Sequence, residues 1–267
     1  MQANERRGIA LITGGTSGIG AACARALEAD GWKVYVAARS NRGGADNFIT
    51  LDVTDETAAA RAAAKFAERE QRLDVLIHAA GMGIAGAAED TPDEDAHRQM
   101  ETNYFGVLRV GRHFMPLMRR GGGGNVIVIG SVAGLVAVPF QSHYSSSKYA
   151  LEAYVEALRM EAKPLGIRAM LIEPGDTRTG FTQARHFSLP EGSPYAQACR
   201  KAVAVMERDE QNGVSPDTTA VLAARYAGRK RLPVRKVVGL QYKALALLRR
   251  VLPAWLGERL VAMTYRG

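Results

Sequence analysis

The residues best suited to chemistry are Tyr144 and Lys148, with Ser131 thirteen positions before the tyrosine. A helix that starts near Ser145 would place Tyr144 and Lys148 one turn apart on the same face. An isolated phenol has a pKa of about 10, and a neighbouring ammonium lowers that pKa because opposite charge stabilises the phenolate. Such a tyrosine can exchange a proton near neutral pH, while the Ser131 hydroxyl donates a hydrogen bond to an oxygen that gains negative charge. A chance occurrence of this spacing on a solvated helix is the alternative.

A glycine-rich turn near the amino terminus has the pattern of a phosphate-binding turn. The apolar run 8–13 is typical of a buried strand, and residues 21–30 favour a helix. Gly14, Gly18 and Gly20 lie between them, where glycine lets the backbone approach a diphosphate and the helix amino terminus offers N–H groups. The spacing G-x3-G-x-G differs from the commoner dinucleotide fingerprint, so an ordinary turn is the alternative.

The second predicted strand, 32–38, indicates which nucleotide the turn would bind. In a doubly wound fold the end of this strand meets the adenosine ribose, and an acid there accepts a hydrogen bond from the 2′-hydroxyl of NAD. This chain has Ala38 and then Arg39 at that place, with Arg42 close by. Guanidinium groups suit the 2′-phosphate of NADP. The sequence therefore favours NADP over NAD, and a solvated surface arginine is the alternative.

Three further apolar runs, 48–51, 74–77 and 125–130, predict buried strands. The connection before the first of them is too short and glycine-rich for a helix. Asp52 follows that strand and either caps the next helix or binds the amino group of adenine. Ser131 follows the last of them, at the carboxyl end, which is where ligands bind in open α/β sheets.

A long helix is predicted over residues 93–111, with Asn103 inside it. Asparagine is mildly unfavourable within a helix, so we expect its side chain to be hydrogen-bonded. His78 lies at the end of the preceding strand, where a structural histidine is commoner than a ligand. No neighbouring residues have metal-ligand spacing, and no metal site is expected.

Together these motifs resemble the short-chain dehydrogenase/reductase family over about residues 8–180. The resemblance implies an α/β chain with a single doubly wound Rossmann domain over 1–267, a seven-stranded parallel sheet, helices on both faces and a C-terminal helical extension. It also implies hydride transfer between a nicotinamide and a carbonyl or alcohol. The motifs that carry it are Thr13–Gly20, Asp52-Val53, Ala79–Gly81, Asn103, Ser131, Tyr144-x3-Lys148 and Pro174–Thr179.

The resemblance gives each matching residue a role. Tyr144 would be the acid–base, Ser131 would orient the substrate oxygen, and Lys148 would lower the tyrosine pKa and hold the nicotinamide ribose. Asn103 would fix a water in a proton relay from Lys148 to solvent. His78 departs from the family, which usually has asparagine there. The cofactor would contact Gly14, Thr16, Ser17, Gly18, Ile19, Gly20, Arg39, Asp52, Val53, Ala79, Ala80, Gly81, Tyr144, Lys148, Pro174, Gly175, Thr177 and Thr179.

Segment 180–227 is expected to form the substrate lid, with helices that open at Ser193-Pro194 and Ser215-Pro216. Through the resemblance, the side chains expected near the reactive carbonyl are almost all apolar. This composition indicates an apolar ketone, aldehyde or alcohol, such as a steroid, retinoid or other lipid. The residues are Met82, Ile84, Leu135, Val136, Val138, Phe140, Phe181, Phe187 and Leu189.

Segment 228–267 is a basic amphipathic extension that resembles those of steroid- and retinol-dehydrogenase-like members. Residues 225–267 hold eleven lysines or arginines and one glutamate, whereas the rest of the chain is nearly neutral. We expect its helices to pack on their own domain beside the pocket; weak peripheral contact with an anionic membrane is the alternative. Nucleic acid is not expected because no binding motif accompanies the charge. The apolar stripe comprises Leu240, Leu245, Leu248, Val251 and Leu252.

Composition limits the remaining possibilities. The 267 residues carry a net charge of +8 and are 47% hydrophobic, which suits a sizeable core and argues against disorder. Two distant cysteines and no visible signal-peptide pattern predict a reducing, cytoplasmic location. Leu151, Tyr154, Val155 and Leu158 form a stripe that, by the resemblance, predicts a homodimer or homotetramer; an ordinary core face is the alternative.

The leading hypothesis is an NADP-dependent oxidoreductase acting on an apolar carbonyl or alcohol. An NAD-dependent alcohol dehydrogenase is one alternative. Another is a regulatory protein that keeps the fold and senses the nucleotide, which predicts a damaged catalytic set. Ser131, Tyr144, Lys148 and Asn103 are all present, which counts against the sensor.

Overall fold

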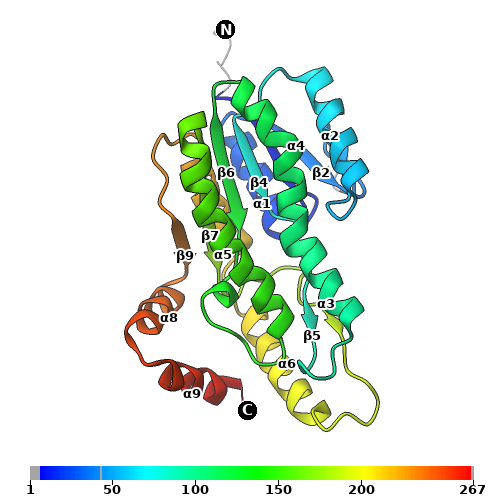
Figure 1. Cartoon of the computed structure of the whole chain (residues 1–267), viewed down its shortest axis with the longest axis vertical. Helices are drawn as coiled ribbons and strands as arrows, with labels where there is room; N and C mark the ends of the chain where they lie inside the picture. Colours follow the sequence, from blue (N-terminus) through cyan, green and yellow to red (C-terminus); the bar gives the residue numbers. More distant parts are fainter. Residues whose placement is uncertain (1–6, 43, 266–267) are drawn as a thin grey trace.

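A parallel sheet forms the centre of the computed structural model, which describes residues 7–42 and 44–265 (Figure 1). Within these residues seven strands pair in the order β3-β2-β1-β4-β6-β7-β9, and every pairing is parallel. The chain order reverses between β1 and β4, which creates a switch point at the carboxyl ends of the strands. The predicted doubly wound Rossmann fold is thereby confirmed. The strands are β1 (Ile9–Thr13), β2 (Lys33–Ala38), β3 (Phe48–Thr50), β4 (Val75–His78), β6 (Gly124–Ile129), β7 (Ile167–Pro174) and β9 (Arg235–Val238).

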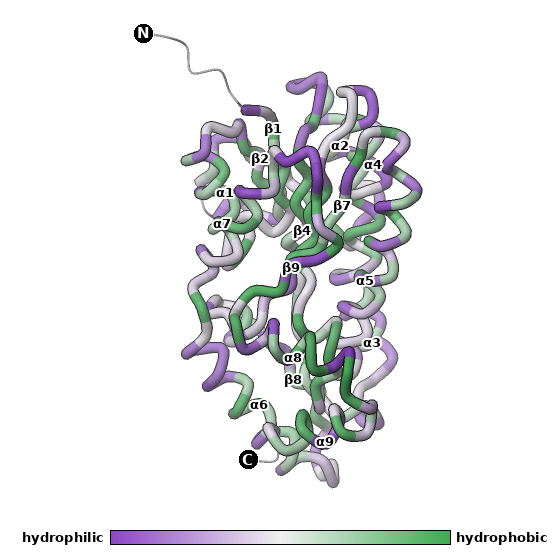
Figure 2. The backbone as a smooth tube through the Cα atoms, turned by 90° about the vertical axis from the view of Figure 1, so that its left-hand side faces the viewer, coloured by the Kyte–Doolittle hydropathy of each residue, from purple (hydrophilic) through white to green (hydrophobic). Residues whose placement is uncertain are grey.

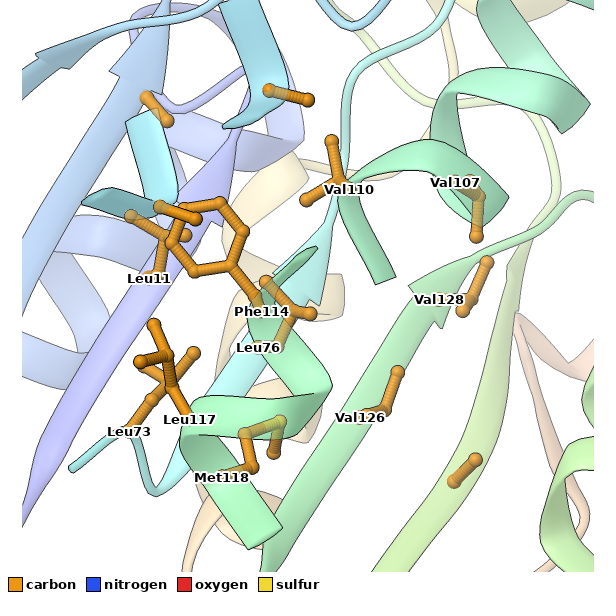
Figure 3. Packing of buried hydrophobic residues seen from close by; sticks show 14 of the residues in the cluster. Leu11, Leu73, Leu76, Val107, Val110, Phe114, Leu117, Met118, Val126 and Val128 are labelled. Carbon is orange, nitrogen blue, oxygen red and sulfur yellow. The ribbon is translucent and has the colours of Figure 1, made fainter. Parts of the chain in front are cut away.

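Helices cover both faces of the sheet because successive strand residues point to opposite sides. Leu11 of β1 packs toward α2 (Glu56–Arg69), α4 (Gly106–Arg120) and α5 (Ser142–Ala162). Its neighbours Ala10 and Ile12 pack on the other face, beneath α1 (Gly18–Ala29) and α7 (Pro216–Ala227). Figure 3 shows the first of these cores, in which the Phe114 ring from α4 lies among aliphatic side chains of the strands.

A second layer of short elements lies beyond the carboxyl ends of the strands, in the lower half of Figure 1. There β5 pairs in parallel with β8, a small sheet that the sequence does not predict. The carboxyl terminus adds two helices after β9, as expected for the extension. These elements are α3 (Asp93–Met100), β5 (Ile84–Ala85), β8 (His186–Phe187), α6 (Ala196–Gln211), α8 (Leu240–Val251) and α9 (Ala254–Tyr265).

The predicted helix over 93–111 is wrong in its extent and its regularity. The helical segment continues to Arg120, and a π-helical turn at Glu101–Phe105 separates α3 from α4. Gly111 does not end the helix; a Cβ there would meet the Tyr154 hydroxyl of α5 at 3.5 Å, an ordinary contact distance. Asn103 lies in the π turn, and its contacts are described with the site.

Helix-start predictions were met to different degrees. Ser215 caps α7 by accepting the backbone N–H of Asp217, as the Ser-Pro pair predicts. Ser193 donates to the Asp90 carboxylate and accepts the backbone N–H of Tyr195, but α6 begins at Ala196 rather than at residue 194. Asp55, not Asp52, caps α2 by accepting the N–H groups of residues 57 and 58. The proposed capping role of Asp52 is therefore wrong.

The stripe on α5 that suggested a subunit interface serves the core of the chain itself. Leu151, Val155 and Leu158 are buried against the sheet, and Tyr154 packs edge-on against Tyr104. The ordinary explanation for the stripe is therefore correct. The homodimer or homotetramer stays a prediction that no longer has this observation behind it.

Candidate active site

A cleft of about 1730 Å³ lies at the carboxyl ends of the strands, at the switch point. A pocket for one drug-sized ligand spans about 300–1000 Å³, so this cleft has room for a dinucleotide and a second molecule. Of the predicted site residues, Gly20 and Asn103 do not line it. Those that do are Gly14, Thr16, Ser17, Gly18, Ile19, Arg39, Asp52, Val53, Ala79, Ala80, Gly81, Ser131, Tyr144, Lys148, Pro174, Gly175, Thr177 and Thr179.

The glycine turn at one end of the cleft is shaped for close approach. Gly14 and Gly18 adopt φ values of +65° and +51°, a conformation that side chains disfavour. Gly20 lies behind the turn, where a Cβ would come within 2.3 Å of the Gly14 carbonyl oxygen. Ser17 precedes α1 without making a side-chain cap, so the first N–H groups of this helix lack a side-chain acceptor. These donors and the helix dipole suit a diphosphate.

Two guanidinium groups lie beside this turn. Arg39 and Arg42 line the cleft, are exposed, and form no ion pair with any other described residue. Asp52 lines the cleft beside them, and its carboxylate accepts two hydrogen bonds from Thr54, at 2.9 Å from the amide and 2.8 Å from the hydroxyl. Burial acts to raise the pKa of Asp52, but these bonds and the charge of Arg39 leave it below its usual value. Unpaired cations beside a phosphate-binding turn fit the 2′-phosphate of NADP.

Tyr144 and Ser131 meet at the other end of the cleft. Ser131 Oγ accepts the backbone N–H of Ala133 at 3.1 Å. Its hydroxyl also interacts with the Tyr144 hydroxyl and acts to lower the pKa of that phenol. Burial raises the pKa of Tyr144, and the bond from Ser131 and the charge of Arg185 only partly oppose this shift. The Tyr144 ring also packs against Phe181, with 5.8 Å between centroids. In this state the phenol keeps its proton at neutral pH.

Lys148 lies one helical turn after Tyr144 and is buried. Its ammonium donates a hydrogen bond to the Ile129 carbonyl oxygen at 3.0 Å and lies 5.7 Å from the centre of the Tyr144 ring. Burial lowers the pKa of Lys148 to about 8, so the group is still mostly charged at neutral pH. The structure thus places the positive charge near the tyrosine, while the lysine itself hydrogen-bonds the backbone. The predicted lowering of the tyrosine pKa is wrong for this structure, because burial leaves the pKa of Tyr144 raised and Lys148 is not among the groups that oppose it.

Asn103 lies outside the cleft and holds one of its walls. Its amide accepts the Met82 N–H at 2.9 Å and donates to the Met82 carbonyl at 3.0 Å and to the Ser147 hydroxyl at 3.1 Å. Ser147 in turn donates to the carbonyl of Tyr144 at 2.7 Å. Asn103 lies in the π-helical turn, and its side chain is buried against Met82 and Ser147 instead of facing solvent. The hydrogen bond expected from its position in a helix is confirmed.

The substrate end of the cleft is only partly the apolar pocket that the sequence predicts. Met82, Val136, Val138 and Phe181 line it, but Ile84, Leu135, Phe140, Phe187 and Leu189 do not. Phe140 and Leu189 pack on a small core around α6, and Phe187 is exposed. These residues belong to β8 and to turns whose direction the sequence does not reveal. The missing places are taken by α8 and α9, with Leu240, Tyr242, Leu245, Leu260, Val261, Thr264 and Tyr265 in the lining.

The same end holds acidic residues that the sequence interpretation missed. Asp176, Asp209 and Glu210 line the cleft. Glu210 accepts hydrogen bonds from the Thr182 hydroxyl and from Arg185, whose side chain is fully buried. Tyr242 donates to Asp176 and lies against Gly175. Asp176 follows the Pro-Gly pair directly, so its position was readable, whereas α6 and α8 carry no motif that points to the cleft.

His78 ends β4 as a buried residue, and burial lowers its pKa to about 3. It is therefore neutral at physiological pH, and it does not line the cleft. This agrees with a structural histidine.

Comparison with known proteins places the chain in a family. A sequence model of the family described as "short chain dehydrogenase" matches residues 8–187. The chain belongs to the short-chain dehydrogenase/reductase family. It is therefore an NAD(P)-dependent oxidoreductase by family.

Relatives with names support the same assignment. The chain is 37% identical over 235 residues to a 3-ketodihydrosphingosine reductase of Bacteroides thetaiotaomicron, which covers 86% of this chain and 87% of that protein. It is 32% identical to the bovine (Bos taurus) dehydrogenase/reductase SDR family member 7B, over 100% of this chain and 84% of the relative.

Solved structures share the fold. A short-chain dehydrogenase from Streptomyces avermitilis superposes with a TM-score of 0.79 at 31% identity, covering 90% of this chain and 91% of the other. A short chain dehydrogenase from Burkholderia cenocepacia, solved in complex with NADP, gives a TM-score of 0.74 at 25% identity over 94% and 96% of the two chains.

Proposed function

We propose that this protein is an NADPH-dependent reductase of ketones carried on long apolar molecules, with Tyr144 as the proton donor. One observation carries the proposal. A single cleft joins Ser131, Tyr144 and Lys148 at one end to the unpaired Arg39 and Arg42 at the other. A dinucleotide laid between them would have its reactive end at the tyrosine and its 2′-phosphate at the arginines.

The cofactor end fits NADP by charge and shape. The turn around Gly14 and Gly18 leaves room for the diphosphate, and no acid follows β2 to accept a ribose hydroxyl. The Burkholderia relative bound to NADP supports the same choice. When bound, reduced nicotinamide supplies the hydride that the carbonyl carbon receives.

The tyrosine suits the reductive direction. Its raised pKa keeps a proton on the phenol, and Tyr144 can give that proton to the carbonyl oxygen as the carbon becomes tetrahedral. Ser131 is placed to donate a hydrogen bond to the same oxygen. The charged Lys148 beside the ring would stabilise the phenolate that remains. Asn103 acts in this proposal by positioning Met82 and α5; its part in a proton relay stays a prediction.

The substrate class follows from the other end of the cleft. Met82, Val138 and Phe181 join Leu245 and Leu260 of the extension to make an apolar part of the lining, beside the acidic residues described above. Among the steroid-, retinoid- and lipid-like substrates that the sequence suggests, a sphingoid ketone is the first candidate. The 37% identity to a 3-ketodihydrosphingosine reductase over most of both chains supports it.

The test is a paired titration and turnover assay. Nicotinamide fluorescence would report binding of NADPH and NADH, and absorbance would follow NADPH oxidation with long-chain ketones and with short water-soluble ketones. We expect NADPH to bind at least about tenfold more tightly, since one charge-assisted contact is worth about 1.5–3 kcal/mol. Arg39→Asp should remove most of that preference while NADH binding changes little.

Two results would contradict the proposal. Tighter binding of NADH would mean that Arg39 and Arg42 do not read the phosphate. If long-chain ketones were turned over no faster than short ones, the proposed lipid-like substrate would be wrong, but the protein would still be a reductase.

A further inference from the structure

The two C-terminal helices leave an apolar surface uncovered. Along α8, the residues at Leu240, Ala244, Leu247, Leu248 and Val251 share one face, at the spacing of an amphipathic helix, and all five are exposed. Leu247 is 64% exposed and Val251 is 68% exposed. Helix α8 packs inward instead through Tyr242 and Leu245, on the opposite side. The apolar stripe predicted to pack on the domain therefore mostly points away from it.

Helix α9, which contacts α8, also carries exposed apolar residues. Trp255 is 64% exposed, and Met263, two turns later, is also exposed. Figure 2 shows apolar segments along both helices at the end of the molecule opposite the amino terminus. We call this surface, made of Leu240, Leu247, Leu248, Val251, Trp255, Leu260 and Met263, the α8–α9 face. Exposed apolar residues gathered on two neighbouring helices favour an interaction site over ordinary scatter.

The charges around the α8–α9 face select among possible occupants. Lys243 and Arg250 flank it on α8, and Arg259 lies between Trp255 and Met263 on α9. All three are exposed, and none forms an ion pair with another described residue. A second copy of the chain would bring these like charges together across a two-fold interface. A negatively charged surface would instead attract these basic side chains.

We propose that the α8–α9 face binds the surface of an anionic lipid bilayer. Basic amphipathic helices lie in the headgroup region, and their binding combines buried apolar area with attraction to anionic lipids. Trp255 suits the membrane–water interface, where an indole has one apolar side and one polar group. None of the helices in the described ranges is long and apolar enough to cross a bilayer, so this contact is peripheral.

The α8–α9 face also continues into the active-site cleft. Leu240 and Leu260 belong to both: they are exposed, and they line the cleft. A long-chain ketone could therefore pass from the bilayer into the cleft along apolar surface. This route rests on the proposed lipid-like substrate, whereas the bilayer contact itself does not.

The experiment measures binding to vesicles by sedimentation. Full-length protein would be mixed with phosphatidylcholine vesicles, with and without phosphatidylglycerol. We expect binding to the anionic vesicles only. Trp255 gives a second readout because Trp32, the other tryptophan, is buried, so a blue shift of emission reports entry of the α8–α9 face into lipid.

Matched variants locate the contact. Lys243→Gln with Arg250→Gln should weaken vesicle binding by at least about tenfold, from about 1 kcal/mol for each basic residue at such a surface. Leu247→Ser with Val251→Ser should do the same. None of these four residues lines the cleft, so turnover of a short water-soluble ketone should stay unchanged. Arg119→Gln with Arg120→Gln, and Met160→Ser, are controls of equal kind on other exposed surfaces and should bind as the parent does.

Three outcomes would overturn the bilayer contact: no sedimentation with anionic vesicles, equal loss in the control variants, or a fall in solution mass in the α8–α9 variants, which would identify a second copy as the occupant. Binding to vesicles by a protein that reduces no ketone would support the bilayer contact and contradict the proposed function, so the two failures are distinguishable.

Discussion

At the scale of single residues, the site depends on one phenol held in a protonated state. Burial raises the pKa of Tyr144 and so keeps its proton in place, although the neighbouring Ser131 hydroxyl partly opposes this shift. Lys148 supplies a charge close to the ring. A group in this state can donate a proton to a developing alkoxide without first gaining one from solvent.

Tyr144→Phe tests this role directly. The variant keeps the ring contact with Phe181 and loses only the hydroxyl. We expect turnover with NADPH and ketone to fall by about 10²- to 10⁴-fold, while NADPH affinity in the fluorescence titration changes little. Tyr154→Phe, on the same helix but away from the cleft, is the matched control and should keep parental turnover. Full activity in Tyr144→Phe would remove the tyrosine from the mechanism.

His78 predicts a pH dependence of stability. An unfolded histidine has a pKa near 6.5, and burial lowers the folded value to about 3. Between these values the unfolded chain binds more protons, so the free energy of unfolding falls as pH decreases, by up to about 1.4 kcal/mol per pH unit. The measurement is urea unfolding at about pH 7, 6 and 5, which lie above and within this window. In His78→Asn the free energy of unfolding should decrease less steeply with falling pH than in the parent. Replacement of the exposed His97 by Gln should leave the slope unchanged.

At the scale of elements, β9 is held by side chains from helix α5. Arg159 donates to the carbonyl groups of Leu232 and Pro233 at 3.0 and 2.9 Å, just before the strand. Arg235, the first residue of β9, pairs with Glu152 of α5 at 2.9 Å and lies 3.9 Å from the Glu173 carboxyl of β7. The last strand of the sheet therefore depends on a buried group of charges.

These contacts explain which elements the sequence could predict. Strands β1, β4 and β6 are uninterrupted apolar runs, and each was found. Strand β9 reads Arg235-Lys-Val-Val, inside a segment that looks like a solvated basic tail, and its partners on β7 and α5 lie more than 60 positions away. The sequence also failed to predict the π-helical turn. Local propensity does not indicate such a turn, and the hydrogen bond of Asn103 with Met82 becomes visible only in the folded chain.

The charge cluster makes a second prediction of pH dependence, opposite in sign to that of His78. Burial and then the neighbouring Glu152 carboxyl raise the pKa of Glu173 well above its usual value near 4.5. The folded chain therefore holds a proton that the unfolded chain releases, so stability falls as pH rises above that usual value. Glu173→Gln removes this loss, and its gain over the parent in urea unfolding should be larger at pH 9 than at pH 6. An equal difference at both pH values would mean that Glu173 is ionised in the folded chain.

At the scale of the whole molecule, the cleft is built from both ends of the chain. The glycine turn after β1 lines one end of the cleft, and α8 lines the other end more than 200 residues later. The motif residues of this cleft were readable from the sequence almost completely. The wall formed by α8 and α9 was not, because Tyr242 reaches Gly175 and Asp176 only through the folded chain.

This arrangement predicts that cofactor binding slows hydrogen exchange in helix α8, near the carboxyl terminus. Tyr242 packs on Gly175, which is expected to lie against the nicotinamide carboxamide, and its hydroxyl donates to Asp176. Ordering of the loop that carries Gly175 should therefore stabilise α8 against local opening. In hydrogen exchange, saturating NADPH should slow the amides of both the glycine turn and α8, and leave α2, which does not line the cleft, unchanged.

Tyr242→Ala separates the protection of the glycine turn from the protection of α8. The substitution removes the ring from Gly175 and the hydrogen bond to Asp176, but it leaves Gly14 and Gly18 untouched. NADPH should then still protect the glycine turn while the protection of α8 is lost. If α8 in the parent protein exchanges equally fast with and without NADPH, the contact at Gly175 does not couple the extension to the cofactor.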